Sequence, residues 1–291
     1  MNCGPNVNAE RAQGPRAGST IGSVGTAGVI VGTLVAAGLL AAWHLQLDLR
    51  EIWPAHRSWA PAREFFIAAA RPAVQFQGTY QGSGAHSLLA QAMQAAVLTV
   101  VFAATSLSIA LVGGVALGFL SSVSLMGGGR GRSVVVVVRL ISSLLRSVHE
   151  LIWAVVLLAA LGYSHLVAVV AIAIPYAGTL AKVFSEVMDE APRDAAQALE
   201  LSGANPLQRF AWGVLPRALP DMIAYTYYRF ECALRSSAVL GFFGFPTLGY
   251  HIAASFENLY YNEVWTYLYV LLSLVLLVEW WSSRLRRELV S

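Results

Sequence analysis

Three long stretches without a charged side chain constrain this sequence more than any other feature. Residues 17–47, 72–129 and 151–181 contain no Asp, Glu, Lys or Arg. Each stretch is longer than the roughly 20 apolar residues that a helix needs to cross a bilayer. Charged residues make up 12% of the chain, which is about half their share in soluble domains. Because lipid admits only helices and closed barrels, the pattern predicts an all-α, polytopic membrane protein.

The remaining composition argues against several other classes. A formal net charge of +3 is typical of basic loops beside membrane lipid and does not indicate a nucleic-acid partner. Cys3 and Cys232 provide neither a disulfide framework nor a C-x-x-C motif. His149-Glu150 begins the zinc motif H-E-x-x-H, but Trp153 occupies the place of the second His. We therefore expect no metal and no cofactor bound by this chain.

Changes in composition divide the chain into segments. Residues 1–20 are rich in Gly, Asn, Pro and Arg and are predicted to be a disordered cytoplasmic terminus. Residues 21–43 are predicted to be a retained transmembrane helix, because a signal peptide has a shorter apolar run of about 7–15 residues. Residues 44–87 are expected to be an exterior segment with an interfacial helix. Residues 88–283 hold the other spans, and 284–291 form a basic cytoplasmic tail.

The pattern predicts six transmembrane helices. The second lies within 88–120, where closely spaced glycines would let another helix approach. The third must begin near residue 140 to be long enough, and it therefore carries Arg146 and Glu150 on one helix. The others are expected at about 165–184, 217–240 and 264–281.

One region allows two interpretations. A span at 217–240 would place Arg229, Glu231 and Arg235 in the membrane. The alternative is the uncharged window 236–256, whose glycines and proline suit a re-entrant segment better than a continuous helix. The first interpretation is preferred, because it gives six spans with both termini on one side.

The basic residues indicate the orientation. With both termini in the cytoplasm, the interior segments carry 13 basic residues and the exterior segments carry four. This asymmetry follows the positive-inside rule, which the four exterior arginines weaken without reversing.

A charged segment at 189–216 interrupts the apolar pattern. Pro192 suits the first turn of a helix, and Gly203 suits the left-handed residue that ends it. The helix between them has two faces. The small apolar face is formed by Ala191, Ala195, Ala198, Leu199 and Ser202, and the polar face by Arg193, Gln197 and Glu200.

A second short helix is predicted directly after this one. Asn205-Pro206 supplies a cap and a first helical residue. Leu215-Pro216 is expected to break the helix before the next span. The segment is thus either a compact helix–turn–helix or an amphipathic loop on the lipid surface, and these residues fit both interpretations.

The same segment resembles the "EAA" loop of ABC-importer permeases. Gly203 is followed by nine residues, then Gly213, one residue and Leu215-Pro216. The family has Ile at the position of Gly213. At the start of the motif, where the family reads Glu-Ala-Ala, this chain has Gln197-Ala198-Leu199.

Further stretches resemble permeases of the phosphonate importer family, over roughly residue 88 to the C-terminus. They are 228–231, Arg235-Ser236, 239–241 and Gly244, together with Arg146 and 150–153. The chain departs from the family at His149, where Pro is common, and at 245–247, where the family has a Gly-rich turn.

The resemblance implies a type I ABC-importer permease in a bacterial inner membrane, a transport subunit and not an enzyme. It implies a dimer of ATPase subunits that binds the ATP and Mg, a periplasmic or lipid-anchored solute-binding protein, and a second permease copy in a homodimer. The solute would be phosphonate or a related small oxyanion such as phosphate or phosphite. The ATPase-coupling residues would be Gln197, Ala198, Glu200, Gly203, Leu215 and Pro216.

Ionisable residues inside the membrane are costly and mark functional sites by default. Glu231 and Arg235, like Arg146 and Glu150, are spaced i, i+4 and are expected to form ion pairs that neutralise themselves. Arg229 has no such local partner. It would face the translocation pathway and bind an oxyanion, pack at the dimer seam, or pair with a residue of a neighbouring helix.

Two other functions are compatible with a polytopic membrane protein. A membrane-embedded enzyme acting on a lipid phosphate could use Arg229 and Arg146 as clamps, but no ordered nucleophile is evident beside them. A secondary transporter would fit the spans, but the sequence shows no internal repeat.

Overall fold

The computed structural model describes residues 20–46, 59–77, 87–126 and 131–290, and these contain helices and turns but no strand. The disordered terminus predicted for residues 1–20 lies outside this part of the chain, apart from Thr20. The chain divides into two units, residues 1–62 and 63–291. The first unit contains α1 (Thr20–His44), a helix over the residues 21–43 that were predicted to form the first transmembrane span. Its large apolar side chains from Val29 to Trp43 are exposed, as lipid contact requires.

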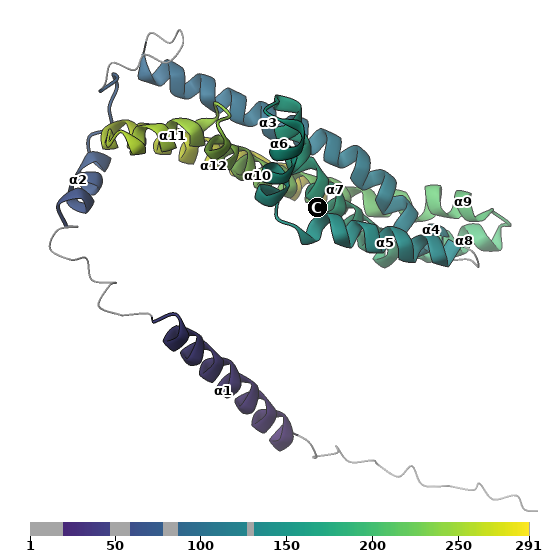
Figure 1. Ribbon diagram of the computed structural model, residues 1–291. Helices are drawn as coiled ribbons and strands as arrows, with labels where there is room; N and C mark the ends of the chain where they lie inside the picture. The colour runs from purple at the N-terminus through teal and green to yellow at the C-terminus, as the bar shows by residue number, and fades with distance from the viewer. Residues whose placement is uncertain (1–19, 47–58, 78–86, 127–130, 291) are drawn as a thin grey trace, which may run out of the picture. The chain divides into compact units, whose positions relative to one another are not determined.

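The second unit is a bundle of membrane helices (Figure 1). Among the described residues, three helices are long and apolar enough to cross a bilayer. They are α3 (Leu88–Ser121), α7 (His165–Glu190) and α12 (Tyr261–Val290). Two bent pairs raise the number to five, and the described apolar part of α1 is a further, shorter helix. The predicted all-α, polytopic fold is confirmed, with three to five candidate spans among the described residues where about six were predicted.

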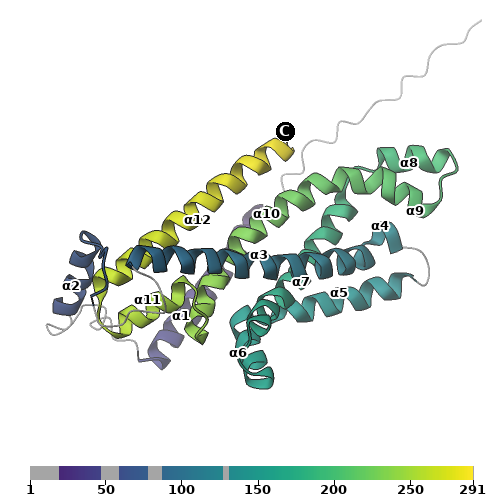
Figure 2. The ribbon, with the colours of Figure 1, turned by 90° about the horizontal axis from the view of Figure 1, so that it is seen from above.

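The core lies where α3 packs along α7 (Figures 1 and 2). A Cβ added at Gly114 would lie 2.5 Å from Leu180 Cβ, and one at Gly118 would lie 3.1 Å from Phe184 Cβ. Leu180 and Phe184 are fully buried as a result. The glycines of α3 thus allow the close helix approach that the sequence predicts.

The third span differs from the prediction. Instead of one helix carrying Arg146 and Glu150, α5 (Gly131–Ser147) and α6 (Glu150–Leu161) meet at an angle of 86°. The break is at His149, whose backbone is extended and whose Nδ1 accepts a hydrogen bond from Leu151 N at 3.3 Å. Because the His149 side chain caps a new helix, Arg146 and Glu150 lie on different helices. Residues spaced i, i+4 are neighbours only within one helix, so this spacing no longer brings the two side chains together.

The region 217–256 contains α10 (Leu215–Val239), a short 3₁₀ turn (Leu240–Phe243) and α11 (Leu248–Glu257). The preferred helix at about 217–240 is confirmed. The alternative window 236–256 is broken near Gly244, which adopts a left-handed φ of 90°, and such a break is what the re-entrant interpretation of this window expected. The two helical parts on either side of this break differ in direction by 43°.

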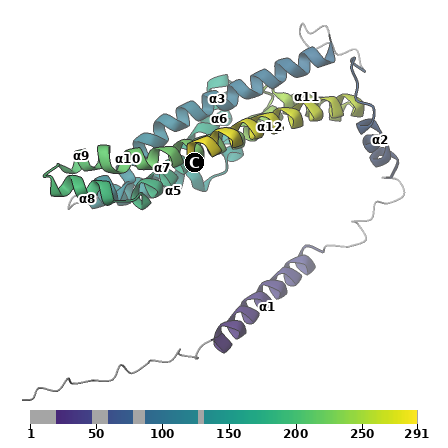
Figure 3. The ribbon, with the colours of Figure 1, turned by 180° about the vertical axis from the view of Figure 1, so that it is seen from behind.

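Helix α12 runs beside α11 and beyond it (Figure 3). It continues to Val290, so the predicted basic tail at 284–291 forms the last turns of this helix. One of its arginines, Arg286, reaches back to Glu231 of α10, with Nη2 and Oε1 3.1 Å apart.

The predicted interfacial helix is present as α2 (Trp59–Ala69). Within the second unit, Trp265 Nε1 donates to the carbonyl of Phe65 at 2.7 Å, and the Tyr269 hydroxyl donates to that of Ala69 at 2.8 Å. Trp and Tyr side chains are enriched at membrane–water interfaces. The structure uses Trp265 and Tyr269 to anchor this segment to α12.

Candidate functional site

The segment 189–216 folds as a helix–turn–helix. Its first helix, α8 (Asp194–Leu201), ends where Gly203 has a φ of +85°. The N–H of Gly203 donates to the carbonyl of Glu200, and that of Ala204 donates to Leu199, both at 3.0 Å. These bonds and the positive φ form the left-handed C-terminal motif that the sequence predicts at this glycine.

The restart predicted at Asn205-Pro206 is also confirmed. Asn205 Oδ1 accepts from Gln208 N at 2.8 Å, and Gln208 Oε1 accepts from Asn205 N at 3.0 Å. This reciprocal capping box begins α9 (Pro206–Arg209). The end of α8 and the start of α9 are therefore fixed by hydrogen bonds within this segment.

The break expected at Leu215-Pro216 is wrong. The helix continues from α9 through a π-helical turn (Phe210–Val214) into α10, and Leu215 N donates to the carbonyl of Phe210. Pro216 lacks an N–H, and its ring would clash in a regular α-helix. The wider π turn accommodates the proline without ending the helix, so α9 and α10 form one continuous rod.

Helix α8 packs against this rod at a glycine. A Cβ added at Gly213 would lie 2.8 Å from Ala196 Cα and 2.9 Å from Ala196 N. That contact explains why Gly stands where the related loops have Ile. Two ion pairs add to it, Arg209 Nη1 to Glu200 Oε1 at 2.6 Å and Arg217 Nη1 to Asp194 Oδ2 at 3.6 Å.

The side chains expected to couple to an ATPase are mostly at the surface. Gln197, Ala198, Glu200, Gly203 and Pro216 are exposed, whereas Leu215 is half-buried. The predicted apolar face of α8 needs correction, because Ala198 and Ser202 are exposed and Ala196 is half-buried instead. Helix α8 turns this half-buried side toward the rod at Gly213.

Large apolar side chains are exposed on the same segment, which the sequence analysis did not single out. Leu201 is 91% exposed, Trp212 75% and Leu207 65%. They lie among charged residues and not within an apolar span. Exposed apolar groups of this kind are suited to contact with another protein or with lipid.

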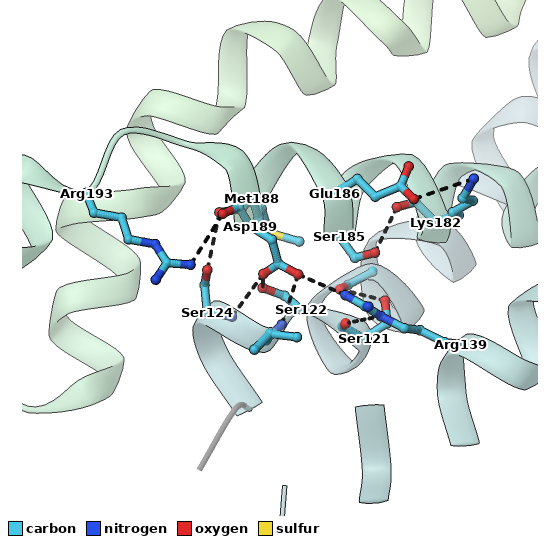
Figure 4. Close-up of polar contacts among 12 residues, drawn as sticks. Ser121, Ser122, Ser124, Arg139, Lys182, Ser185, Glu186, Met188, Asp189 and Arg193 are labelled. Atoms are coloured by element: carbon cyan, nitrogen blue, oxygen red, sulfur yellow. Dashed lines mark hydrogen bonds and ion pairs between the residues drawn. The ribbon is translucent and has the colours of Figure 1, made fainter. Parts of the chain in front are cut away.

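A carboxylate fixes this segment to the spans (Figure 4). Asp189 Oδ1 accepts from Ser122 Oγ at 2.8 Å and from Ser124 N at 2.9 Å, at the start of α4 (Val123–Met126). Asp189 Oδ2 accepts from Arg139 Nη2 at 2.9 Å. We call these residues the Asp189 junction. The sequence analysis missed it, because its partners are about 50 to 67 positions away in the chain.

Replacing Asp189 by alanine should lower the free energy of unfolding by about 1–3 kcal/mol, because it leaves the α4 N–H groups and Arg139 without their acceptor. Thermal unfolding of the purified protein in detergent measures this change. The control is Asp194→Ala, since Asp194 is 89% exposed in its ion pair with Arg217 and such surface pairs contribute little. Equal melting temperatures for the two variants would contradict a stabilising role for the junction.

A second group of polar residues lies within the spans, where α6, α7 and α10 meet. Ser236 Oγ donates to Glu150 Oε1 at 2.7 Å, and Tyr176 Oη lies 3.0 Å from Ser236 Oγ. Since the single Ser236 proton goes to the carboxylate, the Tyr176 hydroxyl donates to Ser236. The Arg229 guanidinium lies over the Tyr176 ring, 4.2 Å from its centroid. We call these four residues the polar node.

The polar node connects two predicted site residues, Arg229 and Glu150. The residues that connect them, Tyr176 and Ser236, were not identified in the sequence analysis. Arg229 has no carboxylate oxygen within 4.0 Å among the described residues, and its Nε is buried without a hydrogen-bond partner there. A desolvated guanidinium with an unused N–H is suited to bind an anion.

Both predicted ion pairs are wrong. Glu231 is buried and pairs with Arg286 of α12 instead of Arg235. Arg235 is exposed. Arg146 is separated from Glu150 by the 86° bend and lines a different cavity. Tertiary contacts replaced the local partners of the two glutamates, because Glu231 pairs with Arg286 and Glu150 accepts a hydrogen bond from Ser236.

Comparison with known proteins identifies the family. Residues 114–290, more than half of the chain, match the family described as binding-protein-dependent transport system inner membrane component. The chain belongs to this family. The permease is therefore a multi-pass membrane protein of a transport family, and the matched region contains the 189–216 segment and the whole polar node.

Curated relatives agree with this assignment. The permease is 36% identical over 155 residues to the phosphite transport system permease protein PtxC of Stutzerimonas stutzeri, covering 52% of this chain and 55% of the relative. It is 28% identical over 113 residues to the putative cryptic phosphonate transport system permease protein PhnE2 of Escherichia coli. This match covers 39% of this chain and 93% of the relative. The chain thus spans about half the length of PtxC.

A solved structure shows the same fold. The permease aligns with a chain of the MetNI methionine ABC transporter in an inward-facing conformation, with a TM-score of 0.58 and 22% identity. The alignment covers 68% of this chain and 95% of that chain. This confirms the predicted architecture of a type I ABC-importer permease.

Proposed function

We propose that the chain is the permease subunit of an ATP-binding-cassette importer and forms the pathway for a small phosphorus oxyanion. Phosphonate, phosphite and phosphate are the candidate solutes. The family assignment and the names of PtxC and PhnE2 support this proposal. They favour an importer over a lipid-phosphate enzyme or a secondary transporter.

The polar node supports the proposal that the solute is an oxyanion. Arg229 places a buried Nε without a partner between spans. A buried polar group without a hydrogen bond costs about 1–3 kcal/mol, and a solute oxygen would remove that cost. Tyr176 holds the guanidinium by a cation–π contact without neutralising it. The positive charge therefore stays available to an oxyanion.

The 189–216 segment supports the proposal that an ATPase drives this permease. Its exposed apolar residues and the rigid π turn suit a short lever that docks into an ATPase and moves α10. In this arrangement the segment and both termini are cytoplasmic in a bacterial inner membrane. ATP and Mg belong to the ATPase dimer, and this chain needs no cofactor of its own. An exterior binding protein delivers the solute to a permease homodimer.

Co-expression tests the proposed function. The chain, co-expressed with candidate ATPase and binding-protein subunits of the same genome, should purify as one complex whose ATPase activity rises when the loaded binding protein is added. The binding protein should retain phosphite, phosphonate or phosphate when analysed by mass spectrometry after release. A complex that forms only with other partners, or a binding protein that retains an uncharged solute, would contradict the proposal.

A further inference from the structure

A second polar cavity, separate from the polar node, lies between the α3, α5 and α7 helices. Its volume is about 210 Å³, several times the roughly 30 Å³ that one water occupies in the liquid. Three cationic side chains line it, Arg139, Arg146 and Lys182, against one carboxylate, that of Glu186. Figure 4 shows Arg139, Ser185 and Lys182 on the same side of Asp189.

A buried hydroxyl in the cavity wall has no partner. Ser142 is 2% exposed, and its Oγ makes no hydrogen bond to any residue that the structure describes. Burying such a group without a partner costs about 1–3 kcal/mol. An acceptor atom inside the cavity would satisfy the Ser142 hydroxyl.

Two of the three cations have a carboxylate partner, Arg139 with Asp189 and Lys182 with Glu186, so the group keeps one net positive charge. Arg139 is fixed by the Asp189 carboxylate and by the carbonyl of Ser121, through Nη2 and Nε, which leaves Nη1 free to bind. Arg146 has no ion pair among the described residues. Lys182 and Glu186 are 3.5 Å apart and about half exposed, a pair of a kind that contributes only about 0–1 kcal/mol.

We infer that this cavity binds a tetrahedral oxyanion of the phosphate type. Arg139, Arg146 and Lys182 supply the charge, and the Ser142 hydroxyl donates to one of the anion's oxygens. The anion is either free phosphate in the cytoplasm or the phosphate of a lipid headgroup in the inner leaflet. The inference holds for any transported solute, because the cavity contains none of the residues of the polar node.

The sequence provides a direct probe, since Lys182 is its only lysine. The full-length permease, in phosphatidylcholine nanodiscs, is treated with an amine-reactive acetylating reagent and analysed by peptide mass spectrometry. Inorganic phosphate should protect Lys182, whereas chloride at equal ionic strength should not. The N-terminal amine, labelled in the same sample, reports any general effect on the reagent.

Variants test the binding residues. Ser142→Ala and Arg146→Ala should each raise the phosphate concentration for half-protection about tenfold or more, because each loses a hydrogen bond to a charged ligand. Arg132→Ala is the matched control, since it removes an exposed charge from the same helix and should leave protection unchanged. Size-exclusion profiles identify a misfolded variant. Protection of Lys182 by phosphate in the wild-type protein tests the site without any variant.

Nanodiscs that contain phosphatidic acid distinguish the two sources. Protection by this lipid without added phosphate, lost in Arg146→Ala, supports binding of a headgroup. Protection by free phosphate in phosphatidylcholine supports a soluble anion. If neither protects Lys182, or if Arg132→Ala weakens protection as much as Arg146→Ala, the inferred site is overturned.

Discussion

Replacing Arg229 by alanine should reduce uptake of the phosphorus oxyanion by about 10- to 100-fold. The substitution removes the guanidinium of a half-buried arginine whose buried Nε has no partner in the described structure, so it removes an anion-binding group and breaks no ion pair among the described residues. Uptake is measured with radiolabelled phosphite or phosphate in proteoliposomes that contain the complete transporter. Arg229→Lys should recover only part of the rate, because an ammonium group cannot bind two oxygens in a fixed plane.

The matched control for this prediction is Arg284→Ala. Arg284 also lies over an aromatic ring, that of Trp280, with 4.3 Å to the centroid. It is exposed near the end of α12 and lies outside the polar node. Its loss should leave uptake within about twofold, as is usual for surface charges. Normal uptake by an equally well assembled Arg229→Ala transporter would show that Arg229 serves packing only.

Replacing Gly203 by aspartate should abolish association with the ATPase subunit while the permease keeps its fold. Gly203 has a left-handed φ and no atom within 4 Å of an added Cβ. The new side chain would therefore cost about 1–2 kcal/mol of local strain without a clash inside the chain. It would project a charge beside the exposed Leu201, where we propose that the ATPase docks. Co-purification on a tag carried by the ATPase measures the loss.

Gly162 offers an unusually close control for this experiment. It also has a positive φ, of +78°, and open space around an added Cβ. It lies between α6 and α7, outside the 189–216 segment. Gly162→Asp therefore introduces the same charge at another glycine with a positive φ, and ATPase association should persist. Equal association of both variants would count against docking at Gly203.

Local rules predicted the ends of the short helices well. The turn at Gly203 and the capping box at Asn205 each depend on residues within five positions of one another, so their hydrogen bonds can be assigned from spacing. The bend at His149 and the π turn before Pro216 also have local causes. The sequence analysis misjudged them, because a histidine cap and a π turn are rarer solutions than a continuous or a broken helix.

The sequence by itself determined the class of the molecule, its apolar spans and the form of the 189–216 segment. Those features follow from hydrophobicity and from contacts between neighbours along the chain. Only the tertiary structure decided which charges meet. Glu231 pairs with Arg286, Asp189 joins α4 and α5, and Glu150 reaches Arg229 through Ser236 and Tyr176. Buried polar groups must find partners wherever packing brings them close, and helix packing links residues that are far apart in sequence.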